Sequence, residues 1–155
     1  MSDPRQGTAA DPASDDAGGW VSARIGRGHY HTDLRARSHA FPADEPIARG
    51  GSDRGPTPYE LLLGALSSCT VITLRMYADR KGWPLDWAEV RLRTARSHEE
   101  DCENCEASDV GITSIEREVE LSGELTDEQR GRLMQIADRC PVKRTLEQSI
   151  RIVPA

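Results

Sequence analysis

A long apolar stretch in the middle of the chain, Leu61–Leu74, constrains the fold more than any other feature. It is apolar or small on nearly every helical face, and Glu60 and Arg75 close it. A helix of that kind has to be surrounded by other parts of a protein. A membrane span needs roughly 20 apolar residues. The shorter run therefore predicts a buried core helix and no membrane partner.

Capping signals mark both ends of this helix. Thr57 suits the N-cap, Pro58 suits the first helical position, and Glu60 has the spacing that completes a capping box. Good helix formers continue to Lys81, and Gly82 then stops the helix. We therefore expect one long central helix between these two signals.

The segments on either side of this helix carry patterns of strands and shorter helices. Short or alternating apolar runs predict strands at residues 20–25, 30–36, 38–41, 87–96, 115–121 and 150–153. A second capping box at Thr126 and Gln129 predicts a helix to about Arg139, and Pro141 begins a last helix to Gln148. The predicted fold class is α+β, with N-terminal strands, a long buried central helix, further strands and a C-terminal helix pair.

Length and composition suggest how this fold is organised. A chain of 155 residues suits one domain, which we expect over residues 19–155. Residues 1–18 are mostly Pro, Gly, Ser, Asp and Ala with almost nothing to bury, so they are predicted to be a disordered tail. Aromatic residues make up only 5% of the chain. A core this lean favours completion by a partner subunit.

Charge and the N-terminal sequence exclude several classes of function. The formal net charge of −6 argues against a nucleic-acid partner, which requires clustered cations, and against an anionic membrane surface. The N-terminal residues contain no apolar region of a signal peptide. We therefore expect a cytoplasmic protein. In that compartment its 4 cysteines are more often redox groups or metal ligands than structural disulfides.

Two of the cysteines lie where a thiol could react. Cys69 lies inside the apolar helix with the small residues Ala65 and Thr73 one turn away, where an inert core thiol is the alternative. Cys140 precedes Pro141 and so takes an N-cap position, where the helix dipole and nearby cationic side chains lower a thiol pKa. Taken alone, neither position decides between a reactive and an inert thiol.

The other two cysteines, Cys102 and Cys105, form a CxxC motif in an acidic loop. With His98 and an acid the spacing permits a zinc site, which needs four ligands. The acidic neighbours raise thiol pKa values and disfavour a dithiol oxidant. A reduced surface pair or an incidental disulfide is the simpler interpretation. We predict no metal and no cofactor.

Taken together, these segments resemble the OsmC/Ohr family of osmotically induced proteins and organic hydroperoxide resistance proteins. The resemblance is carried by residues 55–70, GPTPYELLLGALSSCT, and by residues 137–142, ADRCPV, in that order. It extends from Trp20 to Val153, and the CxxC loop looks more like an OsmC-like branch than like the peroxidases proper. The fold it implies is the OsmC-like one, assembled as an interlocked homodimer.

The resemblance also implies a function, that of a peroxiredoxin-like organic hydroperoxide reductase. The Cys69 thiol would attack the peroxide, and Cys140 would resolve the resulting sulfenic acid as a disulfide. Glu60 and an arginine from the N-terminal strands, Arg27 or Arg24, would support the thiolate. The substrate would be an organic hydroperoxide, and a dithiol would be the reductant.

Two alternatives stay open at this point. One is a catalytically silent OsmC-like dimer that serves as a binding module. The other is a zinc-binding protein that uses the Cys102 and Cys105 loop.

Overall fold

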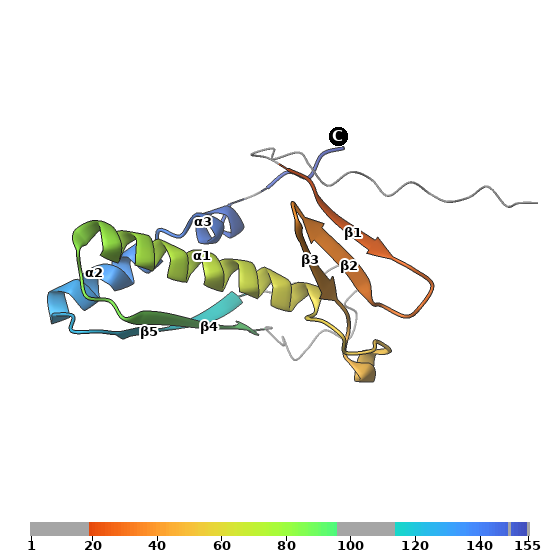
Figure 1. Cartoon of the computed structure of the whole chain (residues 1–155), viewed down its shortest axis with the longest axis horizontal. Coiled ribbons are helices and arrows are strands. Elements are labelled where there is room, and N and C mark those ends of the chain that lie inside the picture. Colours follow the sequence, from red (N-terminus) through yellow and green to blue (C-terminus); the bar gives the residue numbers. More distant parts are fainter. Residues whose placement is uncertain (1–18, 96–113, 149, 155) are drawn as a thin grey trace, which may run out of the picture. The chain divides into compact units, whose positions relative to one another are not determined.

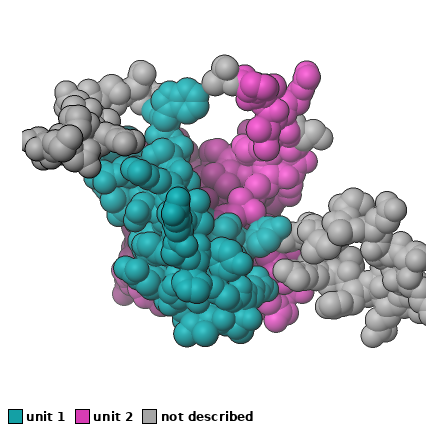
Figure 2. Space-filling model, turned by 90° about the vertical axis from the view of Figure 1, so that its right-hand side faces the viewer, with its two compact units in different colours: residues 1–61 teal, residues 62–155 magenta. Residues whose placement is uncertain are grey.

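The computed structural model describes residues 19–95, 114–148 and 150–154. The chain divides into two compact units, residues 1–61 and residues 62–155, which Figure 2 colours separately. The predicted tail and the CxxC loop lie outside the described residues. One domain over residues 19–155 stays a prediction.

The first unit contains a three-stranded antiparallel sheet in the order β1-β2-β3 (Figure 1). Its elements are β1 Val21–Ile25, β2 Thr32–Ala36, β3 His39–Ala43 and a short 3-10 helix, η1 Ile47–Arg49. All three N-terminal strands predicted from short apolar runs are present. The turn that joins β1 to β2 contains Arg27.

A buried carboxylate organises the Gly- and Pro-rich loop that follows β3. Asp44 accepts hydrogen bonds from the backbone N–H groups of Glu45 at 2.8 Å, Arg54 at 3.2 Å and Ser52 at 3.4 Å. Gly51 is required by close approach, because a Cβ there would lie 1.8 Å from the carbonyl oxygen of Glu45. These contacts hold the loop in a defined shape before the long helix begins.

The predicted capping signals bound the central helix, α1 Pro58–Lys81. At its start the Glu60 N–H donates to Thr57 Oγ1 at 3.2 Å and the Thr57 N–H donates to Glu60 Oε2 at 2.7 Å. At its end Gly82 adopts the left-handed conformation with φ of 64°, which a glycine adopts without the steric cost of a Cβ. Both ends of the helix are as the sequence predicts.

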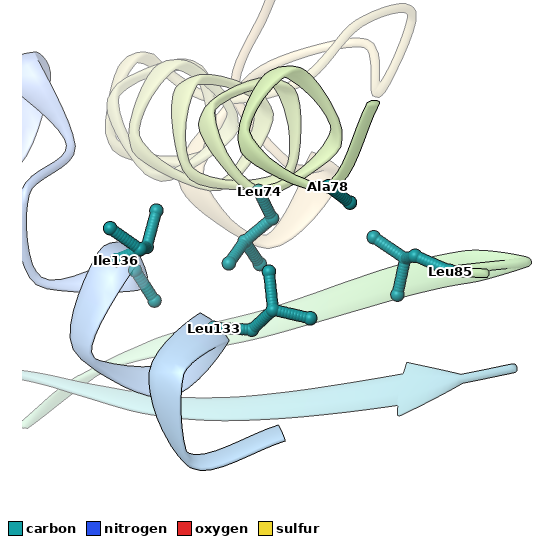
Figure 3. Close-up of a cluster of buried hydrophobic side chains, with 6 residues drawn as sticks. Leu74, Ala78, Leu85, Leu133 and Ile136 are labelled. Atoms are coloured by element: carbon teal, nitrogen blue, oxygen red, sulfur yellow. The ribbon is translucent and has the colours of Figure 1, made fainter. Parts of the chain in front are cut away.

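The second unit packs the rest of α1 with an antiparallel strand pair and two shorter helices. The remaining elements are β4 Trp87–Ala95, β5 Ser114–Ser122, α2 Asp127–Ala137 and α3 Pro141–Leu146. In the core, Leu74 and Ala78 of α1 point towards Leu133 and Ile136 of α2 and towards Leu85 (Figure 3). The α+β fold class is confirmed.

Within one chain α1 is buried along only one side. Its buried residues, Leu66, Thr70, Leu74 and Ala78, recur at every fourth position and form a single stripe. On another face Ile72 is 56% and Met76 67% exposed. The sequence predicts a surrounded helix, and the described residues of one chain cover only part of it. By length and composition alone α1 is also apolar enough to cross a membrane, a test that core helices of other proteins pass too.

The predicted closing strand at residues 150–153 is wrong. Residues 150–154 form no regular element, and the side chain of Ile152 is 98% exposed. A strand needs a neighbour to satisfy its backbone N–H and C=O groups, which an apolar pattern alone cannot supply. The two C-terminal helices end slightly early, at Ala137 and Leu146.

Candidate active site

The structure brings two free thiols together in the second unit. Cys69 lies in the middle of α1 and is half-buried, whereas Cys140 is the N-cap of α3 and is fully buried. A hydrogen bond between the two thiols shifts the pKa of each. Residues far apart in the sequence thus form one pair of neighbouring thiols.

Local chain geometry fixes the place of Cys140. The helix α2 ends at its C-cap Asp138, and Pro141 takes the first position of α3. Because proline has no N–H and a fixed φ, it ends one helix and begins the next. The Cys140 carbonyl then accepts the Arg144 N–H at 3.1 Å, which closes the first turn of α3.

The environment of Cys140 favours its thiolate. Burial raises the pKa of this thiol, but hydrogen bonds outweigh that effect and lower the pKa below its ordinary value. The strongest comes from the Cys69 thiol, followed by the backbone N–H of Lys143, the hydroxyl of Thr70 and the backbone N–H of Val142.

The environment of Cys69 favours its protonated form. Burial raises the pKa of this thiol, and donating a hydrogen bond to Cys140 raises it further. The Val142 N–H and the Thr73 hydroxyl act in the opposite direction without reversing the shift. The pair therefore holds its first negative charge on Cys140, with the Cys69 thiol as donor.

Thr70 ties the thiol pair to the buried stripe of α1. It is fully buried, and its hydroxyl donates to the Leu66 carbonyl at 2.8 Å while also reaching Cys140. A buried hydroxyl needs such partners. The sequence reasoning did not select Thr70, although its place directly after Cys69 in an apolar helix was a signal.

A cavity of about 620 Å³ lies beside α1 and α3 in the same unit. Its apolar wall comes from α1, β4, β5 and α3, through Leu62, Leu66, Leu92, Ile115 and Leu146. Lys143 and Arg117 add positive charge to its lining. Neither cysteine lines the cavity, but its lining residues Leu66 and Lys143 are each one helical turn from a cysteine.

Sequence reasoning also missed Arg117. This arginine occupies a position of β5 where the alternation otherwise places half-buried apolar residues, Ile115 and Val119. Its guanidinium donates to the Ala137 carbonyl at 3.1 Å and to the Asp138 carboxylate at 2.7 Å. A cation on the apolar face of a strand is the signal that could have identified it.

The two other predicted site residues lie in the first unit. Glu60 is exposed, and its hydrogen bonds with the backbone and then the side chain of Thr57 lower its pKa. Arg27 is exposed in the turn after β1, and Arg24 is exposed on β1 itself. Their support of the thiolate stays a prediction.

Metal ligands do not gather among the described residues. No group of three or more His, Cys, Asp or Glu side chains there could hold an ion. The predicted zinc ligands His98, Cys102 and Cys105 lie outside those residues. The zinc interpretation is therefore neither supported nor contradicted.

Comparisons with solved structures support the fold. An OsmC-like protein from Mycoplasma pneumoniae aligns with a TM-score of 0.67 at 18% identity, covering 82% of this chain and 85% of that chain. An organic hydroperoxide resistance protein OsmC from Legionella pneumophila aligns with a TM-score of 0.57 at 15% identity, covering 84% of this chain and 91% of that chain. An organic hydroperoxide resistance protein from Elizabethkingia anophelis aligns with a TM-score of 0.54 at 18% identity, covering 81% of this chain and 86% of that chain.

The fold and the paired thiols define an α+β protein with a dithiol centre. The family model of OsmC-like proteins matches residues 50–154, and the chain belongs to that family. No curated protein sequence is significantly similar to the chain. Family membership suggests organic hydroperoxide resistance or another redox function.

Proposed function

We propose that the protein is a thiol-dependent peroxidase that reduces organic hydroperoxides through Cys69 and Cys140. The observation that carries the proposal is the hydrogen-bonded pair of free thiols beside an apolar cavity. A sulfenic acid must be captured before it is oxidised further, which requires a second thiol within reach. Here the second thiol is near enough to shift the pKa of the first.

Access assigns the first step to Cys69. Cys140 is fully buried, whereas Cys69 is half-buried on the helix whose apolar side lines the cavity. For attack, the proton of Cys69 moves across the hydrogen bond to Cys140. The Cys69 thiolate then forms a bond to the terminal peroxide oxygen, the O–O bond breaks, and the leaving alkoxide takes a proton to become the alcohol.

The second step uses the low pKa of Cys140. Its thiolate attacks the Cys69 sulfenic acid, the S–S bond forms, and the S–O bond breaks to release hydroxide, which is protonated to water. Hydroperoxide and two thiols thus give alcohol, water and a disulfide. A small dithiol reductant then restores both thiols by exchange.

The chain also offers a surface for the proposed homodimer. One face of α1 carries the exposed residues Ala65, Ser68, Ile72 and Met76 at helical spacing. Ile72 and Met76 are large apolar side chains that a monomer would leave in water. We place a second copy of the chain against this face. Together with the charge of −6, the chemistry suits a cytoplasmic protein without a nucleic-acid or membrane partner.

Mass spectrometry after one equivalent of an organic hydroperoxide tests the function. The expected product is a protein lighter by two hydrogens, with the Cys69 and Cys140 peptides joined. Cumene hydroperoxide and hydrogen peroxide should be compared, because the apolar cavity favours the organic substrate. A wild-type protein that keeps both thiols in every hydroperoxide would contradict the proposal and favour the silent binding module.

A further inference from the structure

An arginine reaches from β5 to the turn that carries the resolving thiol. The Arg117 side chain is only 20% exposed and lies on the same side of the strand as Ile115 and Val119. A charge at such a position costs free energy unless it is paired and hydrogen-bonded. The hydrogen-bond partners of Arg117 therefore indicate its role.

Both partners of Arg117 lie just before Cys140. Nη1 donates to the carbonyl oxygen of Ala137, the last residue of α2, at 3.1 Å, and Nη2 donates to the carboxylate of its C-cap, Asp138, at 2.7 Å. Two bonds from one rigid guanidinium fix direction as well as distance. Arg117 thus anchors the end of α2 to β5, two residues before the thiol.

Disulfide formation demands movement of this turn. Both cysteines are free thiols, so their sulfurs lie further apart than the roughly 2.05 Å of a disulfide bond. Cys69 lies on the long helix α1, whose neighbouring residue Thr70 is fully buried in the core stripe. Cys140 lies at the turn between α2 and α3, so the anchor of that turn influences how often Cys140 comes within bonding distance.

We propose that Arg117 is a positioning residue for the resolving step, an inference that rests on the proposed peroxidase function. It holds the turn so that the Cys140 thiolate attacks the Cys69 sulfenic acid before a second peroxide does. In that attack the S–S bond forms, the S–O bond breaks, and hydroxide leaves as water after protonation. The arginine itself exchanges no proton or electron.

The main test separates the two chemical steps. Arg117→Met keeps an unbranched apolar side chain in place of the arginine stem and removes both hydrogen bonds. We expect sulfenic acid formation at Cys69 within twofold of wild type, disulfide formation about tenfold slower, and more sulfinic acid at excess peroxide. Arg117→Lys should recover part of the rate. Arg91→Met is the matched control, because Arg91 is 66% exposed on β4 and pairs with Glu118 at 2.9 Å.

A second arm needs no peroxide. Wild type and Arg117→Met are equilibrated with oxidised and reduced dithiothreitol, and the protein disulfide is quantified by alkylation and mass. We expect the effective concentration of the two thiols to fall about tenfold in Arg117→Met and to stay unchanged in Arg91→Met. Asp138→Ala, which removes one of the two anchors, provides a milder variant if Arg117→Met does not fold.

The two arms distinguish the possible failures. An unchanged resolving rate and an unchanged exchange equilibrium in Arg117→Met would overturn the positioning role. A slower first step with a higher KM and a normal equilibrium would also overturn it and make Arg117 a substrate-binding group of the cavity. If wild type reduces no hydroperoxide but Arg117→Met still shifts the exchange equilibrium, the peroxidase proposal fails while the positioning of Cys140 stands.

Discussion

The two thiols of the site differ in almost every property that controls cysteine chemistry. Cys69 is half-buried in the middle of a long helix, and burial together with its bond to Cys140 raises its pKa. Cys140 is fully buried at the start of a short helix, and hydrogen bonds lower its pKa despite that burial. The Cys69 thiol is the more accessible of the two but is not readily ionised. The Cys140 thiol is readily ionised but is not accessible.

This difference indicates why a dithiol centre uses two unlike positions. A peroxide must reach the attacking sulfur, which favours the position beside the cavity. A resolving thiol needs only to be ionised and near its target. The shared hydrogen bond lets the charge pass from one sulfur to the other, so the two functions can alternate between two residues.

Single serine substitutions of the two cysteines should have the largest effect on peroxide turnover. Cys69→Ser should abolish the first turnover, because among the described residues no accessible thiol remains near the cavity. Cys140→Ser should consume one equivalent of peroxide and then stall, with Cys69 held as a sulfenic acid that is later over-oxidised. Trapping with a sulfenic-acid reagent and mass spectrometry measure both outcomes. The reverse pattern, with Cys69→Ser active and Cys140→Ser inert, would exchange the two roles.

A charge introduced on the exposed face of α1 should have the next largest effect, on the association of two chains. A carboxylate introduced at Met76 would be buried unpaired in the proposed dimer, which costs several kcal/mol, on the order of 3–5. Sedimentation at micromolar concentration should show about twice the chain mass for wild type and the chain mass for Met76→Glu. Met134→Glu on α2 is the matched control, since Met134 is 41% exposed on another helix. A wild type that sediments as a monomer would refute the dimer.

Much of the fold could be predicted because local signals decide it. The capping box at Thr57 and the stop at Gly82 both operate within a few residues, so the bounds of α1 follow from the sequence. The same holds for β4 and β5, where alternation and burial agree. Elements whose stability comes from local contacts are the ones that sequence patterns locate well.

The remainder depended on contacts between distant residues. Residues 150–153 have the composition of a strand, but among the residues that the structure describes no strand pairs with them. No local pattern reports a missing neighbour. The partners of Arg117 lie beyond β5, at the end of α2. The thiol pair likewise needs α1 and the start of α3 in contact, which the family resemblance implied and the spacing of the cysteines could not.

Titration of the isolated thiols should sharpen the comparison. In Cys69→Ala the Cys140 thiol loses its strongest donor, so its pKa should rise. In Cys140→Ala the Cys69 thiol no longer donates to a neighbouring sulfur or meets its charge, so its pKa should fall. Thiolate absorbance against pH measures both shifts, and the two values should approach each other. If the two pKa values moved further apart, the shared hydrogen bond would not be the cause of the difference between the two thiols.

The smallest expected effect belongs to Thr70, whose hydroxyl can turn from the Leu66 carbonyl to donate to the Cys140 thiolate. Thr70→Val keeps the shape of the side chain and removes the donor, so the pKa of Cys140 should rise modestly. Near neutral pH less Cys140 is then ionised, and the resolving rate should fall by a few-fold, as expected for the loss of about 1 kcal/mol from one hydrogen bond. The rate should return towards that of wild type as the pH is raised, because ionisation then no longer limits it.

Thr73→Val is the matched control. The Thr73 hydroxyl donates to the Cys69 carbonyl at 2.7 Å and favours the Cys69 thiolate. The variant should therefore slow the first step and leave the second unchanged. A loss of rate in Thr70→Val that high pH does not restore would mean that this residue holds the two helices in place and does not stabilise the thiolate.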